Sequence, residues 1–228
     1  MNSLYLIVNL ASFVVPFIFS FHPRLKFVNQ FKFALPSIFI AGLLFILWDI
    51  AYTGMGVWGF NPNYVLGIYV NNLPLEEILF FICIPFSCMF TMHCFQILII
   101  RDYFEKFENG ITLVLLGILI GIGGYNYDKL YTAATFLGLA NLLLVVKYIL
   151  KVKWLSRFYF SYLILLIPFF IVNGILTGTG PDEPVVWYND LENLGIRILT
   201  IPIEDFSYGM FLILLNTTLY KLFSRTKS

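Results

Sequence analysis

Charged side chains are scarce in this sequence. Lysine, arginine, aspartate and glutamate together make up 12% of the 228 residues, whereas a soluble domain carries about 25%. The hydrophobic share is 60%, so the chain has too few polar side chains to cover a folded surface in water. This composition excludes a soluble globular protein. The apolar residues form continuous runs rather than alternating segments, which excludes an outer-membrane β-barrel and predicts an all-α, polytopic membrane protein.

Cysteine and histidine are also rare. Cys83, Cys88 and Cys94 lie in a single apolar run, at spacings that fit neither a zinc site nor a disulfide framework. His93 has no second histidine within reach along the sequence. We therefore predict no metal site and no cofactor. The net charge of +1 gives no sign of a nucleic-acid partner, and none is expected.

Seven apolar segments are predicted to cross the membrane as helices. Most of them reach the roughly 20 residues that span the hydrocarbon core of a bilayer. The fourth is short and rich in glycine. The segments are 3–21, 33–54, 75–100, 110–124, 130–150, 158–177 and 201–223.

The distribution of basic residues predicts the orientation. With the N-terminus outside, twelve of the 14 lysines and arginines fall in inner loops or the C-terminal tail, and only Lys129 and Arg197 fall outside. Cytoplasmic loops carry such an excess of positive charge. We therefore expect an integral protein of the cytoplasmic (inner) membrane with its N-terminus outside and its C-terminus inside.

The chain contains an internal repeat. LWDIAYTGMG (Leu47–Gly56) matches IVNGILTGTG (Ile171–Gly180), which aligns Asp49 with Asn173. We predict two three-helix units, 1–109 and 128–228, joined by a linker helix within 110–127. An odd linker span inserts both units in the same orientation, so the repeat is parallel with its axis along the membrane normal.

Each unit ends with a helix that begins Pro-x-Glu-acid. The motifs are LPLEE, with Glu76 and Glu77, and IPIED, with Glu204 and Asp205. One such motif is typical of a helix start, where proline fits the first position and an acid complements the dipole. Two copies with doubled acids at membrane depth indicate a functional site instead.

The repeat axis predicts that the two acid pairs lie on opposite sides of one central cavity. Adjacent helical residues point about 100° apart, so the two acids of a motif cannot face the same atom. We expect Glu76 and Glu204 to form the core pair, with Glu77 and Asp205 either supporting them or reaching the cavity from their own helix faces. The sequence leaves open which acid donates a proton and which group accepts one.

Aromatic residues surround the acids in the sequence. Aromatic faces stabilise cations, and acids in an aromatic, oily cavity suit a carbocation reaction. Ordinary packing is the alternative explanation for each ring. The predicted substrate-binding residues are Asp49, Asn173, Trp48, Tyr52, Phe80, Phe81, Phe206 and Tyr208.

The duplicated motifs in a seven-span chain of this length resemble the small integral-membrane lycopene cyclases, in the form that carries both units in one polypeptide. The resemblance implies an isomerase, a lycopene β-cyclase that converts the open ψ-ends of lycopene to β-rings without redox change, giving γ-carotene and β-carotene. It also implies that Glu76, Glu77, Glu204 and Asp205 are catalytic. The expected partners are lycopene taken from the bilayer, membrane lipid and other carotenoid enzymes.

Two alternatives remain open from the sequence. A carotenoid end-group hydratase would use the same acids but capture water, and a proton-coupled transporter would use them as a relay. A flavin-dependent cyclase is excluded because no Gly-x-Gly-x-x-Gly follows a strand. A retinal protein is excluded because the only lysine of the last span, Lys221, lies at its inner end.

Overall fold

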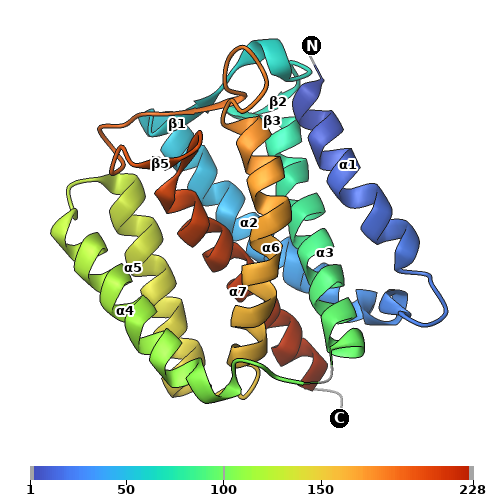
Figure 1. Cartoon of the computed structure of the whole chain (residues 1–228). Coiled ribbons are helices and arrows are strands. Elements are labelled where there is room, and N and C mark those ends of the chain that lie inside the picture. The colour runs from blue at the N-terminus through green and yellow to red at the C-terminus, as the bar shows by residue number, and fades with distance from the viewer. Residues whose placement is uncertain (1–2, 100, 226–228) are drawn as a thin grey trace.

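The structure, a computed structural model, describes residues 3–99 and 101–225. These residues form seven α-helices in a single bundle, with short β-hairpins gathered at one end, which we call the hairpin end (Figure 1). The helices are α1 (Leu4–Phe19), α2 (Phe31–Met55), α3 (Leu75–Leu98), α4 (Glu108–Tyr125), α5 (Leu130–Leu144), α6 (Leu155–Leu176) and α7 (Ile203–Arg225). Each predicted segment overlaps one of these helices, so the prediction of an all-α polytopic membrane protein is confirmed.

Five stretches of the described chain are long and apolar enough to cross a membrane. They are Phe27–Met55, Leu75–Leu98, Glu105–Tyr125, Leu130–Ile149 and Leu155–Leu176. Of the other two helices, α1 has only 16 residues. Helix α7 is long but carries Asn216, Thr217 and Thr218, which are buried inside the bundle and donate hydrogen bonds to carbonyls of the preceding turn. A helix enclosed by protein can carry such polar residues, because they do not meet lipid.

The bundle pairs its helices in a repeated way. Helix α1 packs along α3, and α5 packs along α7. Helix α2 packs closely against both α3 and α7, whereas α6, its counterpart in the repeat, packs much less closely against them. This difference leaves space on the α6 side of the bundle, where the cavity described below is found.

The hairpin end is built from three pairs of short strands. Hairpin β2–β3 (Tyr69–Val70 and Leu73–Pro74) leads into α3, and hairpin β5–β6 (Arg197–Ile198 and Ile201–Pro202) leads into α7. The third pair joins the two halves of the chain, because β1 (Trp58–Phe60) lies antiparallel to β4 (Val186–Tyr188). Its Gly59 is required by the close approach of Trp187, since a Cβ there would lie 2.3 Å from the indole ring.

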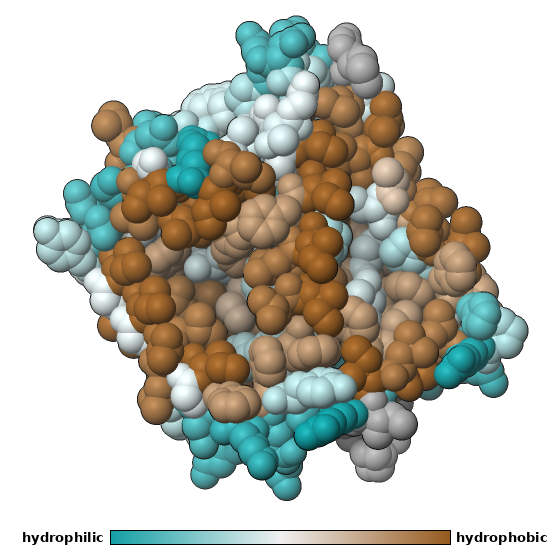
Figure 2. All heavy atoms as spheres, viewed as in Figure 1, coloured by the Kyte–Doolittle hydropathy of each residue, from teal (hydrophilic) through white to brown (hydrophobic). Residues whose placement is uncertain are grey.

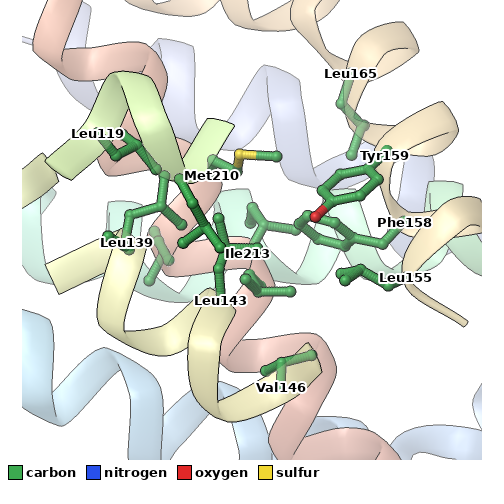
Figure 3. Packing of buried hydrophobic residues seen from close by; sticks show 14 of the residues in the cluster. Leu119, Leu139, Leu143, Val146, Leu155, Phe158, Tyr159, Leu165, Met210 and Ile213 are labelled. Atoms are coloured by element: carbon green, nitrogen blue, oxygen red, sulfur yellow. The ribbon is translucent and has the colours of Figure 1, made fainter. Parts of the chain in front are cut away.

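The largest apolar core lies between α4, α5, α6 and α7. Figure 3 shows Leu119 of α4 meeting Leu139 and Leu143 of α5, with Phe158 of α6 and Ile213 of α7 closing the other side. Helix α4 approaches α5 closely at Gly123, where a Cβ would lie 3.0 Å from the Cβ of Phe136. Small residues at helix contacts let backbones approach in a membrane, where packing rather than the hydrophobic effect holds helices together.

Gly138 of α5 provides a test of this packing. A Cβ at this position would lie 2.6 Å from Phe211 of α7, whose ring is held between Phe45 and Trp48 and cannot easily move away. We expect Gly138→Ala to lower the free energy of unfolding by about 1–3 kcal/mol through overpacking. The measurement is the thermal unfolding midpoint of the purified protein in detergent.

Gly121 of α4 is the matched control, because a Cβ there would meet nothing within 4 Å. Gly121→Ala should leave the midpoint unchanged or raise it slightly, since alanine has the higher helix propensity. Equal midpoints for the two variants would contradict the close packing of α5 on α7.

Candidate active site between α1, α3, α6 and α7

A cavity of about 260 Å³ lies between α1, α3, α6 and α7, and strands β1 and β4 close it at the hairpin end. It extends along the helices from Tyr5 near the hairpin end to Pro16 and Thr91 much deeper in the bundle. Figure 2 shows a hollow on this face, lined by paler, more polar residues, between the apolar surfaces over α6 and α1. The cavity therefore faces the region of the molecule that lipid covers.

Three carboxyl groups and one amide from four helices meet at the hairpin end of this cavity. They belong to Asp49 of α2, Glu77 of α3, Asn173 of α6 and Asp205 of α7. The described lining includes no lysine, arginine or histidine. An ionised carboxylate away from water is stable only with hydrogen bonds or an opposite charge, so the partners of each acid decide what it can do.

Asp205 accepts hydrogen bonds from three side chains. The hydroxyl of Tyr131 donates to Oδ1 at 2.5 Å, while the hydroxyl of Tyr188 and the amide of Asn173 donate to Oδ2 at 3.0 and 2.8 Å. Burial and the neighbouring charge of Asp205 raise the pKa of Tyr188, a residue of the hairpin end, well above its ordinary value, so its hydroxyl keeps the proton that it donates. Three donors to one carboxyl group favour its ionised form.

Glu77 has a different environment. The Tyr5 hydroxyl donates a hydrogen bond to Oε2 of Glu77 at 2.5 Å, and the carboxyl group of Asp49 lies near enough to interact electrostatically. Asp49 in turn accepts hydrogen bonds at Oδ1 from the indole of Trp58 and, at 3.4 Å, from Thr53. Its second oxygen is buried without a hydrogen-bond partner among the described residues. Glu77 and Asp49 therefore form a pair of acids with fewer donors than Asp205.

Glu76 and Glu204 do not line the cavity, although we expected them to form its core pair, and it is Glu77 and Asp205 that reach it. Glu76 and Glu204 each hold a hairpin instead. Oε1 of Glu76 accepts the backbone N–H of Leu66 at 2.6 Å, and Oε1 of Glu204 accepts that of Leu194 at 2.8 Å, in both cases from ten residues earlier in the chain. Because adjacent helical residues point about 100° apart, the next acid of each motif turns into the cavity.

The two halves of the site share two features. Tyr5 of α1 donates to Glu77 as Tyr131 of α5 donates to Asp205. The hairpins also correspond, with a left-handed residue at Asn71 in one and at Leu199 in the other. The repeat found in the sequence is thus present in the hydrogen bonds of the site.

Comparison with known proteins gives one finding. A family model described as lycopene cyclase matches residues 2–95 and 128–223, which is most of the chain. The chain belongs to the lycopene cyclase family. The two matched segments agree with the presence of both repeat units in one polypeptide. No curated protein and no solved structure matches the chain significantly.

Within this lycopene cyclase family member, only some of the predicted substrate-binding residues line the cavity. Asp49, Asn173, Phe80 and Tyr208 line it. The other four, Trp48, Tyr52, Phe81 and Phe206, are not part of its lining, and their role in substrate binding stays a prediction.

Each of these four rings packs against other parts of the bundle. Trp48 and Phe81 pack against Phe45 in the core, Tyr52 packs against Trp58 and Trp48, and Phe206 packs against two phenylalanines of α6. These rings lie away from the cavity lining because closeness in sequence does not fix the helix face on which a ring lies.

Sequence reasoning missed the tyrosines that hold the acids. Tyr5 and Tyr131 follow a leucine at the start of α1 and α5, so the same dipeptide, Leu-Tyr, opens both helices. That repeated pair was a usable signal. Trp58 and Tyr188 lie between the predicted helices, and they reach the site because β1 pairs with β4 and places the two side by side.

The repeat is visible in the tyrosine–acid hydrogen bonds of the site, but the space beside the acids differs between its two halves. In the aligned repeat, Trp48 of α2 corresponds to Val172 of α6. Trp48 packs with Phe45, Tyr208 and Phe211 and fills its side of the bundle, whereas Val172 lines the open cavity. Only the α6 side therefore offers room for a ligand next to the acids. Among the described residues, no group of three or more histidine, cysteine, aspartate and glutamate side chains could hold a metal ion.

The bonds of Glu204 predict how its variants behave. Oε1 of Glu204 accepts from Thr132 at 2.6 Å and from the N–H of Leu194. Glu204→Ala removes this acceptor, and a lost bond to a charged group is worth about 1.5–3 kcal/mol. We expect the Leu194 amide to exchange its hydrogen at least about tenfold faster in this variant, as followed by hydrogen exchange with mass spectrometry.

Glu204→Gln keeps a carbonyl oxygen at this position, so the Leu194 amide should keep most of its protection against hydrogen exchange. Equal exchange in the wild-type protein and in Glu204→Ala would show that Glu204 does not anchor the hairpin.

Proposed function

We propose that this protein is a lycopene β-cyclase, an intramolecular lyase that closes the ψ-ends of lycopene into β-rings. The observation that carries the proposal is the unequal environment of the acids in one aromatic cavity. Asp205 accepts hydrogen bonds from three side chains. Glu77 and Asp49 lie next to each other, and each accepts hydrogen bonds from fewer side chains than Asp205 does. A proton donor and a proton acceptor are thus provided by different helices.

The charges of the cavity support this division. Its described lining holds three carboxyl groups and no basic side chain. The three donors to Asp205 favour its carboxylate form. Two adjacent buried acids without a cation cannot both be ionised. In the proposal the Glu77–Asp49 pair therefore holds a proton, which Glu77 delivers to the substrate.

The reaction that follows is redox-neutral. The proton adds to the terminal alkene of the ψ-end, and the resulting carbocation is attacked by the next suitably placed double bond, which closes the six-membered ring. Asp205, on the other side of the cavity, removes a proton from the ring cation and leaves the β-ring double bond. One proton is gained and one is lost, so the product is an isomer of the substrate and no electrons are exchanged.

Aromatic side chains support the cationic step. Phe80, Trp58, Tyr131 and Tyr208 line the cavity beside the acids. The face of an aromatic ring attracts a cation, with a larger effect where water is excluded. The same rings exclude water, which would otherwise capture the cation and give an alcohol.

The size and position of the cavity indicate how the substrate is held. At about 260 Å³ it is smaller than the roughly 300–1,000 Å³ of pockets that enclose a whole drug-sized ligand. It suits one end group of a long polyene, with the remainder lying between α1 and α6 toward the lipid. In the proposal the two ends are cyclised one after the other, through γ-carotene to β-carotene.

Membrane placement and domain division complete the proposal. We propose that the protein lies in the inner membrane with the hairpin end outside, which the excess of lysine and arginine at the opposite end supports. The division into units 1–109 and 128–228 with a linker at 110–127 is supported by the equivalent hairpins. Association with other carotenoid enzymes stays a proposal that follows from the substrate.

Acid variants test the mechanism. In cells that accumulate lycopene, we expect Glu77→Gln and Asp205→Asn each to reduce ring formation at least about 100-fold, since positioned acids and bases contribute 10²–10⁴. Glu76→Gln is the matched control, because its amide oxygen still accepts the Leu66 N–H. Pigments are separated by chromatography, and protein levels in the membrane are compared by immunoblot.

Several outcomes would contradict this proposal. If lycopene were unchanged in cells with the wild-type protein, cyclase activity on this substrate would be excluded. A hydroxylated product would establish a hydratase instead. Full activity in both Glu77→Gln and Asp205→Asn would exclude these acids from the mechanism.

A second pair of variants tests the cavity itself. Val172→Trp places in α6 the residue that fills the equivalent space in α2, so it should block the cavity and abolish formation of both ring products. Ile171→Trp, at a neighbouring position that is 62% exposed on the lipid side, should leave activity within about twofold. Normal turnover in Val172→Trp would show that the substrate binds elsewhere.

A further inference from the structure

The proposed reaction leaves the acids of the cavity in the wrong protonation state for another turn. Glu77 has given its proton to the substrate, and Asp205 has taken one from the ring cation. Before the next ring can close, a proton must pass from Asp205 to the pair formed by Glu77 and Asp49. A residue of the cavity lining that both accepts and donates a proton would close this cycle.

Five tyrosines belong to the described lining of the cavity. Four of them already donate a hydrogen bond, either to an acid of the site or to a backbone carbonyl. These four are Tyr5, Tyr131, Tyr162 and Tyr188. The fifth is Tyr208 of α7, whose hydroxyl has no hydrogen-bond partner among the described residues. A phenolic hydroxyl can donate and accept, so Tyr208 is the tyrosine of this lining that is free to serve two acids in turn.

Tyr208 lies between the two groups of acids. It follows Asp205 by three residues on α7, and side chains with this spacing lie on the same face of a helix. The centroid of its ring is 6.2 Å from that of Tyr131, which donates to Asp205. It is also 6.2 Å from that of Trp58, which donates to Asp49. Tyr208 interacts electrostatically with all three acids of the cavity.

The ring of Tyr208 is held in place by the core. Its centroid lies 5.1 Å from that of Phe45 and 5.3 Å from that of Trp48, both of α2. A ring packed in this way keeps its position while a substrate enters and a product leaves. Only the O–H bond has to turn for the hydroxyl to change its partner.

We propose that Tyr208 relays a proton from Asp205 to the Glu77–Asp49 pair after each ring closes. The inference rests on the proposed cyclisation. The oxygen of Tyr208 accepts the proton of the Asp205 carboxyl group as the proton of its own hydroxyl passes to the carboxylate of Glu77. One O–H bond forms and one breaks at this oxygen, so the tyrosine is unchanged and Asp205 is again a carboxylate.

The environments of the acids give the transfer its direction. Three donors favour the ionised form of Asp205, whereas Glu77 without its proton lies beside Asp49 with no cation in the described lining. The proton therefore moves from the acid that is better stabilised as a carboxylate to the pair that is less well stabilised. The aromatic lining keeps water from serving as the carrier.

The variant Tyr208→Phe tests the relay, because it keeps the ring and removes only the hydroxyl. Purified full-length protein in detergent is mixed with lycopene, the reaction is stopped at increasing times, and rings formed per protein molecule are counted by chromatography of the pigments. The first ring should form within about threefold of the wild-type rate, since Glu77 begins with its proton. Later rings should form at least about tenfold more slowly than in the wild-type protein, because the hydroxyl that returns the proton is missing.

Tyr162→Phe is the matched control. It removes a hydroxyl from the same cavity, but one that donates to the backbone carbonyl of Phe206 rather than to an acid. The ratio of later to first ring rates in this variant should stay within about twofold of the wild-type ratio. Both rates come from one sample, so a partly unfolded preparation does not alter their ratio.

Three results would overturn the relay while leaving the cyclase in place. They are equal slowing of the first and later rings in Tyr208→Phe, an unchanged ratio in that variant, and the same change of ratio in Tyr162→Phe. Equal slowing would assign Tyr208 to packing or to the cationic step. A wild-type protein that forms no ring would instead overturn the proposed function, and the relay with it.

Discussion

The arrangement of the active site depends on two hydrogen bonds between a glutamate and the backbone of the hairpin before it. Glu76 holds Leu66 and Glu204 holds Leu194. Each bond fixes the rotation of the first turn of its helix, and the next residue, Glu77 or Asp205, is then directed into the cavity. The two acids of each motif therefore have different positions. The first anchors the preceding hairpin, and the second faces the cavity. These two bonds set the direction of the acids. The tyrosines and the β1–β4 pair then contact acids that are already oriented.

The second constraint is the absence of basic residues from the cavity lining. In a membrane interior, an acid without a cation must be stabilised by donors or keep its proton. The chain uses both solutions. Asp205 has three donors, and Glu77 shares its environment with Asp49. The two halves of the repeat thus differ in the number of hydrogen-bond donors around their acids, and the proposed reaction, which adds one proton and removes another, uses that difference.

The third feature is that the repeat is complete in its backbone but incomplete in its packing. Trp48 and the rings around it fill the space beside α2, while Val172 leaves the equivalent space beside α6 open. Duplication supplied two acid motifs, and unequal side chains on α2 and α6 left room for one ligand.

The sequence by itself determined the class of protein, the approximate limits of all seven helices, the repeat and the two acid motifs. Composition, the length of apolar runs and motif spacing are local properties, and they need no knowledge of contacts. Only the tertiary structure decided which acid of each pair faces the cavity, because that depends on the hairpin that captures Glu76 or Glu204. It also decided which rings line the site. Tyr5 and Tyr131 reach the acids across more than 70 residues of chain through helix packing, and no sequence period specifies how two helices are rotated against each other.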